Sequence, residues 1–280
     1  MPFSSCGTEC FNIFYFKIMN NTLKWLSAIG VEYYCSTQPQ KLNFDKPQEN
    51  NQINLMPRKT IDKILKVDTD KMHTNISLAR SLADKVNNIE ELRESLLNFN
   101  GCKLKKFSTN TVFGDGNQKA QVMLIGEAPG STEDLKGIPF CGESGNLLDN
   151  MLHSIGISRK NNAYITNIVF WRPPANRQPT LEEVDICRPF VEKHIALINP
   201  KLIILVGSTA ATSLLGKNSG ITKIRQEYYF YTNKYLSSPI QTTTIFHPAY
   251  LLRHPMQKRT SWYDLLKIKE YLVNNKLILN

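Results

Sequence analysis

The sequence predicts an α/β protein with three layers, α/β/α, around a central, mainly parallel four-stranded sheet. Two observations lead to this fold class. Short strand-like runs alternate along the chain with segments whose apolar residues recur at helical spacing. Each predicted strand also ends in glycine or polar residues, as in open α/β sheets that bind ligands at the carboxyl ends of their strands. The 280 residues, 41% of them hydrophobic, suffice for a sizeable core.

The elements follow one another in strand–helix order. The predicted strands are Val122–Ile125, Tyr164–Val169, Leu202–Val206 and Thr242–Phe246. The predicted helices cover 88–101, 147–156, 180–198, 209–216 and 262–268. Asn88 is expected to cap the first of these helices, and Thr180 with Glu183 forms a capping box for the third.

Three regions are expected along the chain. Residues 1–60 form a variable extension, with a helix over 20–36 and an Asn/Gln/Pro-rich linker over 37–58. Residues 61–100 form a helical lead-in, and residues 101–280 form the main α/β domain. The first residues lack a basic region and a cleavage site, so we expect no signal peptide, with Met19 as an alternative start. No apolar run is long enough for a membrane helix, and we expect a cytoplasmic protein.

Charge and cysteine content narrow the class of partner. The formal net charge of +10 favours an anionic partner, nucleic acid before a membrane surface, although a solvated Lys-rich face explains it equally well. The six cysteines are scattered and include no Cys-x-x-Cys pair. A disulfide framework is therefore not expected.

Chemically capable residues stand at the ends of the predicted strands. The first strand runs into Gly126-Glu127-Ala128-Pro129-Gly130, the second contains Asn167, the third ends in Gly207-Ser208 and the fourth in His247. Glycine permits close approach of a ligand to the backbone. If the strands are parallel, a carboxylate, a carboxamide and an imidazole meet at one edge of the sheet.

Five stretches around these strand ends carry a family resemblance. They are GEAPG at 126–130, GIPFCGESGNLLD at 137–149, YITNIVFWRPPANRQPT at 164–180, HPAYLLRHP at 247–255 and, more weakly, IRQEYY at 224–229. In this order and spacing they resemble the type-4 uracil-DNA glycosylases of the uracil-DNA glycosylase superfamily, over roughly residues 100–275. The resemblance implies a monomeric enzyme with that fold, which hydrolyses uracil from DNA and so initiates base-excision repair.

The resemblance also implies a role for five side chains. Asn167 matches the residue that reads uracil, because a carboxamide accepts from N3–H and donates to O4, a pattern that cytosine lacks. Phe140 matches the residue that stacks on the base, and His247 the one that stabilises the leaving anion at O2. Glu127 matches the active-site carboxylate, and Glu133 a residue that blocks the 5-methyl group of thymine.

Four of these five residues also have an ordinary structural interpretation. Asn167 fits a strand edge, Phe140 a core, His247 a structural position beside proline, and Glu133 a surface. The backbone of Gly126, Glu127 and Ala128 is expected to line the pocket. Type-1 relatives have aspartate where this chain has Ala128, so two roles for Glu127 stay open: orienting water, or stabilising the sugar cation.

Residues near two of the turns are expected to contact DNA. Leu251 and Leu252 follow the His-Pro turn and are expected to wedge into the base stack. Arg253, Arg172 and Arg177 are expected to hold phosphates. A solvated basic loop is the alternative for any one of these residues.

The chain departs from the resemblance at the family's [4Fe–4S] cluster. Such a cluster normally needs four thiolates. Cys102 and Cys187 match two of the ligand positions, whereas Phe99 and Trp171 occupy the other two. We therefore expect no conventional cluster, with Phe99 and Trp171 packed in its place.

Other functions remain open at the level of sequence. A glycosylase of the same fold could act on another deaminated base, such as hypoxanthine or xanthine. A non-catalytic DNA-binding protein that kept the pocket is a second alternative. A nucleotide-binding α/β protein is a third, although Gly-x-Gly-x-x-Gly and Walker patterns are absent.

Overall fold

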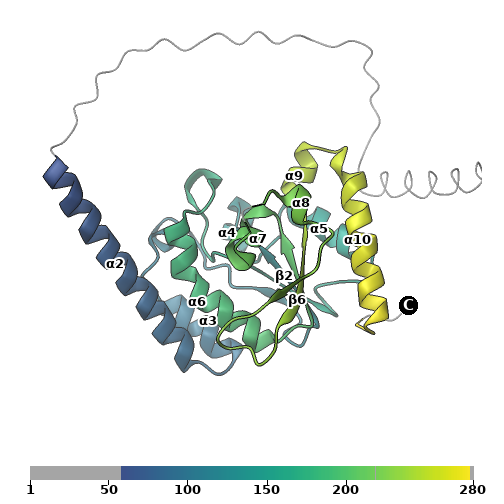
Figure 1. The fold of residues 1–280 in the computed structure, drawn as a ribbon, viewed down its shortest axis with the longest axis horizontal. Coiled ribbons are helices and arrows are strands. Elements are labelled where there is room, and N and C mark those ends of the chain that lie inside the picture. The colour runs from purple at the N-terminus through teal and green to yellow at the C-terminus, as the bar shows by residue number, and fades with distance from the viewer. Residues whose placement is uncertain (1–57, 218, 278–280) are drawn as a thin grey trace, which may run out of the picture. The chain divides into compact units, whose positions relative to one another are not determined.

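The predicted parallel sheet is present, with one additional strand at each edge. The computed structural model describes residues 58–217 and 219–277 (Figure 1). Its strands are β1 (Asp115–Gly116), β2 (Val122–Gly126), β3 (Ala163–Asn167), β4 (Leu202–Val206), β5 (Tyr229–Tyr231) and β6 (Ile240–Ile245). They lie in the order β1-β3-β2-β4-β6-β5. The four predicted strands are parallel neighbours, while β1 and β5 pair antiparallel at the edges, which corrects the predicted four strands to six.

Helices cover both faces of this sheet. The α-helices are α2 (Arg58–Lys85), α3 (Ile89–Asn98), α4 (Ser131–Lys136), α5 (Glu143–His153), α6 (Leu181–Ile198), α7 (Ser208–Leu215), α8 (Ile221–Ile224), α9 (Pro248–Arg253) and α10 (Gln257–Asn274). Two short 3₁₀ helices are η1 (Lys103–Lys106) and η2 (Pro174–Asn176). Helices α3 and α6 lie on one side of the sheet, and α5 and α10 on the other (Figure 1). The three-layer prediction is confirmed.

Local signals in the sequence explain where several helices begin and end. The Asn88 side chain accepts a hydrogen bond from the N–H of Glu91, which caps α3 as predicted. Thr180 and Glu183 form the predicted reciprocal capping box at the start of α6. Helix α7 ends at Gly216, whose φ of 64° is the left-handed conformation that glycine adopts easily.

The register of the strands aligns their carboxyl ends. Gly126 at the end of β2 pairs with Asn167 at the end of β3. At the other side of β2, the end of β4 pairs with the end of β6 through Val206 and Ile245. The residues that follow these strands therefore meet at one edge of the sheet, as parallel pairing requires.

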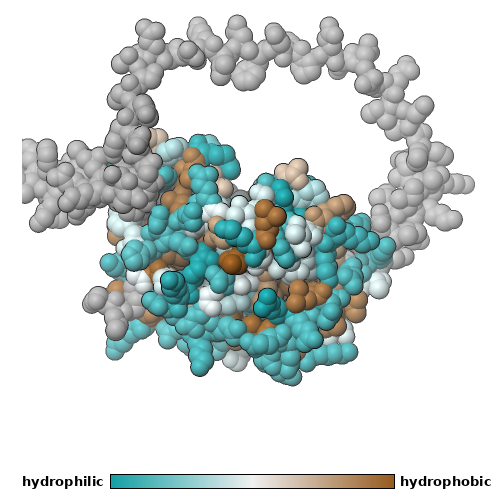
Figure 2. Space-filling model, turned by 180° about the vertical axis from the view of Figure 1, so that it is seen from behind, coloured by the Kyte–Doolittle hydropathy of each residue, from teal (hydrophilic) through white to brown (hydrophobic). Residues whose placement is uncertain are grey.

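Apolar side chains are mostly turned inward in the described part of the chain. The largest fully buried side chains include Trp171, Phe99, Phe170 and Phe190. On the face seen in Figure 2, hydrophilic side chains dominate, and the apolar ones lie in small, separate groups. None of the helices within residues 58–217 and 219–277 is both long and apolar enough to cross a bilayer.

The structure describes only part of the region for which N-terminal features were predicted. The expected helix over 20–36, the linker up to residue 57 and the alternative start at Met19 lie outside the described residues. Residues from Met72 onward form one compact unit. The boundaries at residues 60 and 100 stay predictions.

Candidate active site

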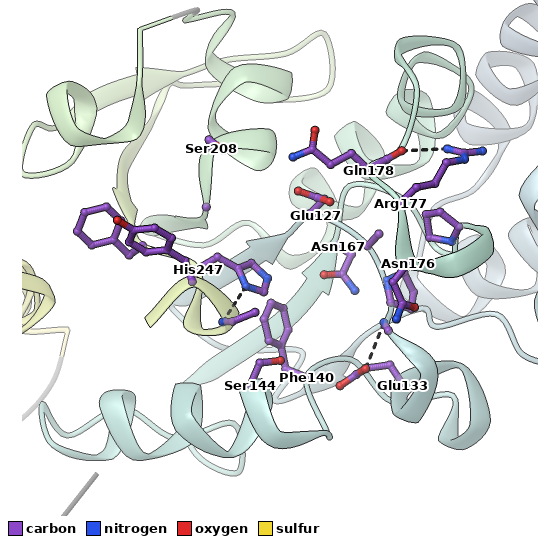
Figure 3. Close-up of a pocket in the computed structure, with 18 of the residues that line it drawn as sticks. Glu127, Glu133, Phe140, Ser144, Asn167, Asn176, Arg177, Gln178, Ser208 and His247 are labelled. Carbon is purple, nitrogen blue, oxygen red and sulfur yellow. Dashed lines mark hydrogen bonds between the residues drawn. The ribbon is translucent and has the colours of Figure 1, made fainter. Parts of the chain in front are cut away.

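A cavity of about 590 Å³ opens at the carboxyl edge of the sheet. Its walls come from the ends of β2, β3, β4 and β6, together with the segments that follow them (Figure 3). The lining includes Glu127, Ala128, Glu133, Phe140, Asn167, Arg177, Gln178, Ser208, His247, Tyr250 and Arg253. The carboxylate, carboxamide and imidazole that the sequence placed at strand ends thus share one cavity.

Asn167 offers an unsatisfied hydrogen-bonding atom at the floor of the cavity. The side chain is buried, and its Oδ1 atom has no hydrogen-bond partner. A buried acceptor without a partner is costly unless a ligand supplies the donor. Strand β3 holds this side chain at a fixed position, because its last residue pairs with Gly126 of β2. Asn167 does lie at the end of a strand, as the structural interpretation expected. Its unpaired Oδ1 atom additionally indicates that a ligand binds here.

The Phe140 ring forms the wall beside Asn167. It is 6% exposed, and its centroid lies 5.6 Å from that of the His247 ring. A Cβ atom on Gly126 would stand 2.5 Å from both the Phe140 ring and Asn167 Oδ1. Glycine at this position therefore allows the aromatic ring and the carboxamide to close on the strand end.

His247 is held as a neutral imidazole with a defined orientation. Its Nδ1 accepts a hydrogen bond from the N–H of Ala249, 3.2 Å away, at the start of α9. Burial, and after it the positive charge of Arg253, lower the pKa of His247 to about 4. A neutral ring whose Nδ1 accepts must carry its proton on Nε2. His247 can therefore donate Nε2–H to an oxygen in the cavity.

Glu127 supplies the carboxylate of the cavity. The residue follows β2 directly, and its backbone carbonyl accepts the N–H of Val169. Its side chain faces the cavity (Figure 3) and forms no hydrogen bond or ion pair with another described residue. A carboxylate left free in this way can interact with a ligand. Gln178 and Ser208 line the same cavity (Figure 3). The sequence placed Ser208 at a strand end but indicated a role in the site for neither residue.

The surface interpretation of Glu133 is wrong. The residue is 8% exposed, and Oε1 accepts the N–H groups of Cys141, at 3.0 Å, and Gly142, at 2.8 Å. Oε2 accepts the N–H of Gly130 at 3.1 Å. The carboxylate thus ties two turns of the cavity wall together. Its predicted contact with a 5-methyl group stays a prediction.

The predicted DNA contacts are placed differently from one another. Leu251 is 1% exposed inside α9 and cannot wedge into a base stack in this conformation, which corrects that prediction. Leu252 is half-buried and does not line the cavity. Arg253 is exposed at the cavity rim. The helix that begins at Pro248 turns residue 251 inward and residue 253 outward.

The other two predicted arginines have protein partners. Arg177 forms a two-pronged ion pair with Glu183, at 2.6 and 2.8 Å. This pair fixes the segment that carries Gln178, whose carbonyl also accepts from Arg177. Arg172 donates to the side chain of Asn176 at 2.7 Å and lies outside the cavity lining.

The residues at the family's cluster positions form a packed apolar core. Phe99 lies so close to Gly101 that a Cβ there would overlap the ring, and it packs on Phe190 with a centroid distance of 5.1 Å. Trp171 is fully buried, with its indole N–H donated to Thr111. Neither side chain can bind iron, and both pack in the apolar core.

The two remaining cysteines are partners of each other. Cys102 and Cys187 are buried free thiols. Their hydrogen bond lowers the pKa of Cys102, while burial raises the pKa of Cys187 well above the usual value. Among the described residues, no three His, Cys, Asp or Glu side chains are grouped so that they could hold a metal ion. Of the four positions that match the family's ligands, all within the described residues, only two carry a thiol, which does not fit a four-thiolate cluster there.

Comparison with known proteins identifies the family. Residues 113–267, more than half of the chain, match the model of the uracil DNA glycosylase superfamily. A type-4 uracil-DNA glycosylase of Sulfurisphaera tokodaii is 36% identical over 195 residues, which cover 68% of this chain and 88% of the relative. Proteins of the same name from Archaeoglobus fulgidus and Thermotoga maritima are also 36% identical, over 92% and 94% of their lengths. The chain belongs to the uracil DNA glycosylase superfamily and to its type-4 branch.

Proposed function

We propose that this protein is a uracil-DNA glycosylase that hydrolyses the bond between C1′ of deoxyribose and N1 of a flipped-out uracil in DNA. The observation that carries this proposal is the convergence of Asn167, Phe140 and His247 on one cavity. A base edge, a base face and a carbonyl oxygen each find a matched group there. Relatives named type-4 uracil-DNA glycosylases support the same activity.

Recognition precedes the chemistry. The uracil stacks on Phe140, a contact of about 1–3 kcal/mol for a base on an aromatic ring. Asn167 Oδ1 accepts from N3–H, which satisfies an otherwise unpaired buried atom, and the amide donates to O4. Cytosine has an acceptor at N3 and a donor at C4, so the same carboxamide rejects it.

Bond cleavage places charge on both fragments. As the C1′–N1 bond breaks, its electron pair stays with uracil, and the sugar becomes cationic. The neutral His247 donates a hydrogen bond from Nε2–H to O2 of the departing anion and retains its proton. Glu127 faces the sugar, where its carboxylate stabilises the cation. The oxygen of a water molecule then bonds to C1′ and loses one proton, the uracil anion takes up one proton, and the products are free uracil and an abasic site.

Three further proposals concern the contact with DNA, the oligomeric state and the cellular compartment. We propose that Arg253, at the rim of the cavity, binds a phosphate of the uracil-containing strand. We also propose that the protein acts as a monomer, because one chain carries all three groups proposed to bind the uracil, Asn167, Phe140 and His247. The free thiols of Cys102, Cys141 and Cys187 suit a reducing compartment, and we place the protein in the cytoplasm.

We also propose that the protein works without a [4Fe–4S] cluster. The packing of Phe99 against Phe190 and the hydrogen bond of Trp171 to Thr111 support this, since both replace ligand positions with stabilising contacts. None of the steps above requires a metal ion.

A nicking assay tests the activity and the site together. Single- and double-stranded oligonucleotides with one uracil are incubated with the wild type, Asn167→Ala and His247→Ala, and abasic sites are then cleaved with alkali. We expect product from the wild type and at least a ~100-fold slower reaction for each variant. No product from the wild type would remove the proposed activity. Wild-type rates from both variants would remove the proposed site.

A further inference from the structure

We propose that Arg159 is a positioning residue that, together with Glu133, holds the Phe140 ring in place for base stacking. The inference rests on the proposed glycosylase activity. Arg159 lies outside the cavity lining, so we do not place it in contact with the base. It acts through the backbone on either side of Phe140.

Arg159 holds two successive carbonyl groups of the cavity wall. Its Nη1 donates to the carbonyl of Pro139 at 3.0 Å, and its Nη2 donates to the carbonyl of Phe140 at 2.8 Å. Two carboxylates fix the guanidinium: Asp149 accepts from Nε and Nη2, and Asp115 accepts from Nη1 at 2.9 Å. The Arg159 side chain is 17% exposed, so these charge-assisted bonds are partly shielded from water.

Glu133 holds the amide groups that come next. Its carboxylate accepts from the N–H of Cys141 and of Gly142. The backbone around Phe140 is therefore bound by a cation at the carbonyls of residues 139 and 140 and by an anion at the amides of residues 141 and 142. Opposite charges meet the matching ends of consecutive peptide groups, which fixes the direction in which the Phe140 side chain leaves the backbone.

The conformation held in this way is strained. Phe140 has a φ of 51°, in the left-handed region that a bulky side chain rarely adopts. Such strain persists only where the surroundings over-determine it. Gly145 lies so close to the Phe140 carbonyl that a Cβ there would overlap it, and Gly126 meets the ring from the other side. Removal of the Arg159 bonds should let the backbone relax and the ring move.

A displaced ring should slow catalysis. A shift of about 1 Å in a positioning group can cost about 10²-fold in rate. We therefore expect Arg159→Met to lower kcat/KM on uracil-containing DNA by about 10–100-fold. If Arg159 only linked β1 to α5, its substitution would lower the stability of the protein, and any effect on kcat/KM would not depend on Phe140.

A double-mutant cycle separates the two roles. kcat/KM is measured for the wild type, Arg159→Met, Phe140→Ala and the double variant, with folding checked by thermal unfolding. If Arg159 acts through the ring, its substitution should change kcat/KM less than about threefold once Phe140 is alanine. Arg188→Met is the matched control, because Arg188 also binds a carboxylate, Asp185, and a backbone carbonyl, Ser213, away from the cavity lining.

The outcomes are distinct. A full 10–100-fold loss in the Phe140→Ala background, or wild-type kcat/KM for Arg159→Met, would overturn the inference while the wild type stays active. An inactive wild type would instead overturn the proposed function. If Arg159→Met does not fold, Arg159→Lys keeps the charge beside Asp149 but loses the planar fork, and it should show a smaller loss that also vanishes with Phe140→Ala. Persistence of that loss would equally contradict the positioning role.

Discussion

The Oδ1 atom of Asn167 lies 2.5 Å from the point where a Cβ on Gly126 would stand. The Phe140 ring is equally close to that point. Gly126→Ala should therefore displace either the carboxamide or the ring and lower kcat/KM by at least ~10²-fold. Gly220→Ala is the control, since its nearest such contact is Thr222 at 3.9 Å. Single-turnover kinetics of both variants would test this, and wild-type activity of Gly126→Ala would contradict the geometry described here.

Arg253 should contribute to DNA affinity through its charge. It is exposed at the rim of the cavity, whereas Arg177 is already paired with Glu183. For Arg253→Ala, the slope of log K against log salt should become shallower by about one. Arg177→Ala should change that slope less and should lower the melting temperature more. Fluorescence anisotropy with an abasic-site duplex at several salt concentrations measures the slopes, and equal slopes for Arg253→Ala and the wild type would exclude a phosphate contact.

Acid should destabilise this fold through two histidines that are held neutral. Burial lowers the pKa of His194 to about 3, and burial with the charge of Arg253 lowers the pKa of His247 to about 4, from the ordinary 6.5. Below about pH 6.5 the unfolded chain binds protons that the folded chain does not, so stability is lost as the pH falls toward these folded pKa values. Between about pH 7 and pH 5, each histidine should lower the free energy of unfolding by about 2 kcal/mol.

His194→Phe isolates one of these contributions. The ring stacks on Phe113 with a centroid distance of 4.3 Å, so phenylalanine suits the site apart from the lost bond to Tyr164. The free energy of unfolding is measured by urea titration at about pH 7 and pH 5. Between these pH values it should fall by about 2 kcal/mol less in the variant than in the wild type. The comparison uses the pH dependence, because the absolute stability also changes. An identical loss in both proteins would show that His194 is not held neutral.

Iron should be dispensable. Phe99 and Trp171 pack where ligands would be needed, and Cys102 is hydrogen-bonded to Cys187. Protein purified without oxygen should contain less than about one iron atom per chain, and a chelator should leave its melting temperature and activity unchanged. Absorbance near 400 nm with about four iron atoms per chain would contradict this expectation.

The parallel sheet and the main site could be predicted because their signals are local. Apolar runs marked β2, β3 and β4, and the residues that follow β2 and β6 within two positions include Glu127 and His247. The edge strands β1 and β5 were missed, since they are two and three residues long and exist through pairing with β3 and β6. Short pairing of this kind leaves little periodicity to detect.

The supporting contacts could not be predicted because they join distant residues. Arg159 meets Phe140 across 19 positions and Asp115 across 44. Glu133 was assigned by analogy, and only the fold shows that its carboxylate binds backbone amides. Leu251 was predicted as a wedge from its apolar character, but the start of α9 at Pro248 turns it into the core.

The identity of the released base tests the proposed uracil pocket most directly. Matched duplexes with one uracil, hypoxanthine, xanthine, cytosine or thymine are incubated with the wild-type protein, and the free base is measured by mass spectrometry. The arrangement of Asn167, Phe140 and His247 predicts release of uracil at least ~100-fold faster than of any other base. Faster release of hypoxanthine or xanthine, or no release of any base, would contradict the proposed uracil pocket.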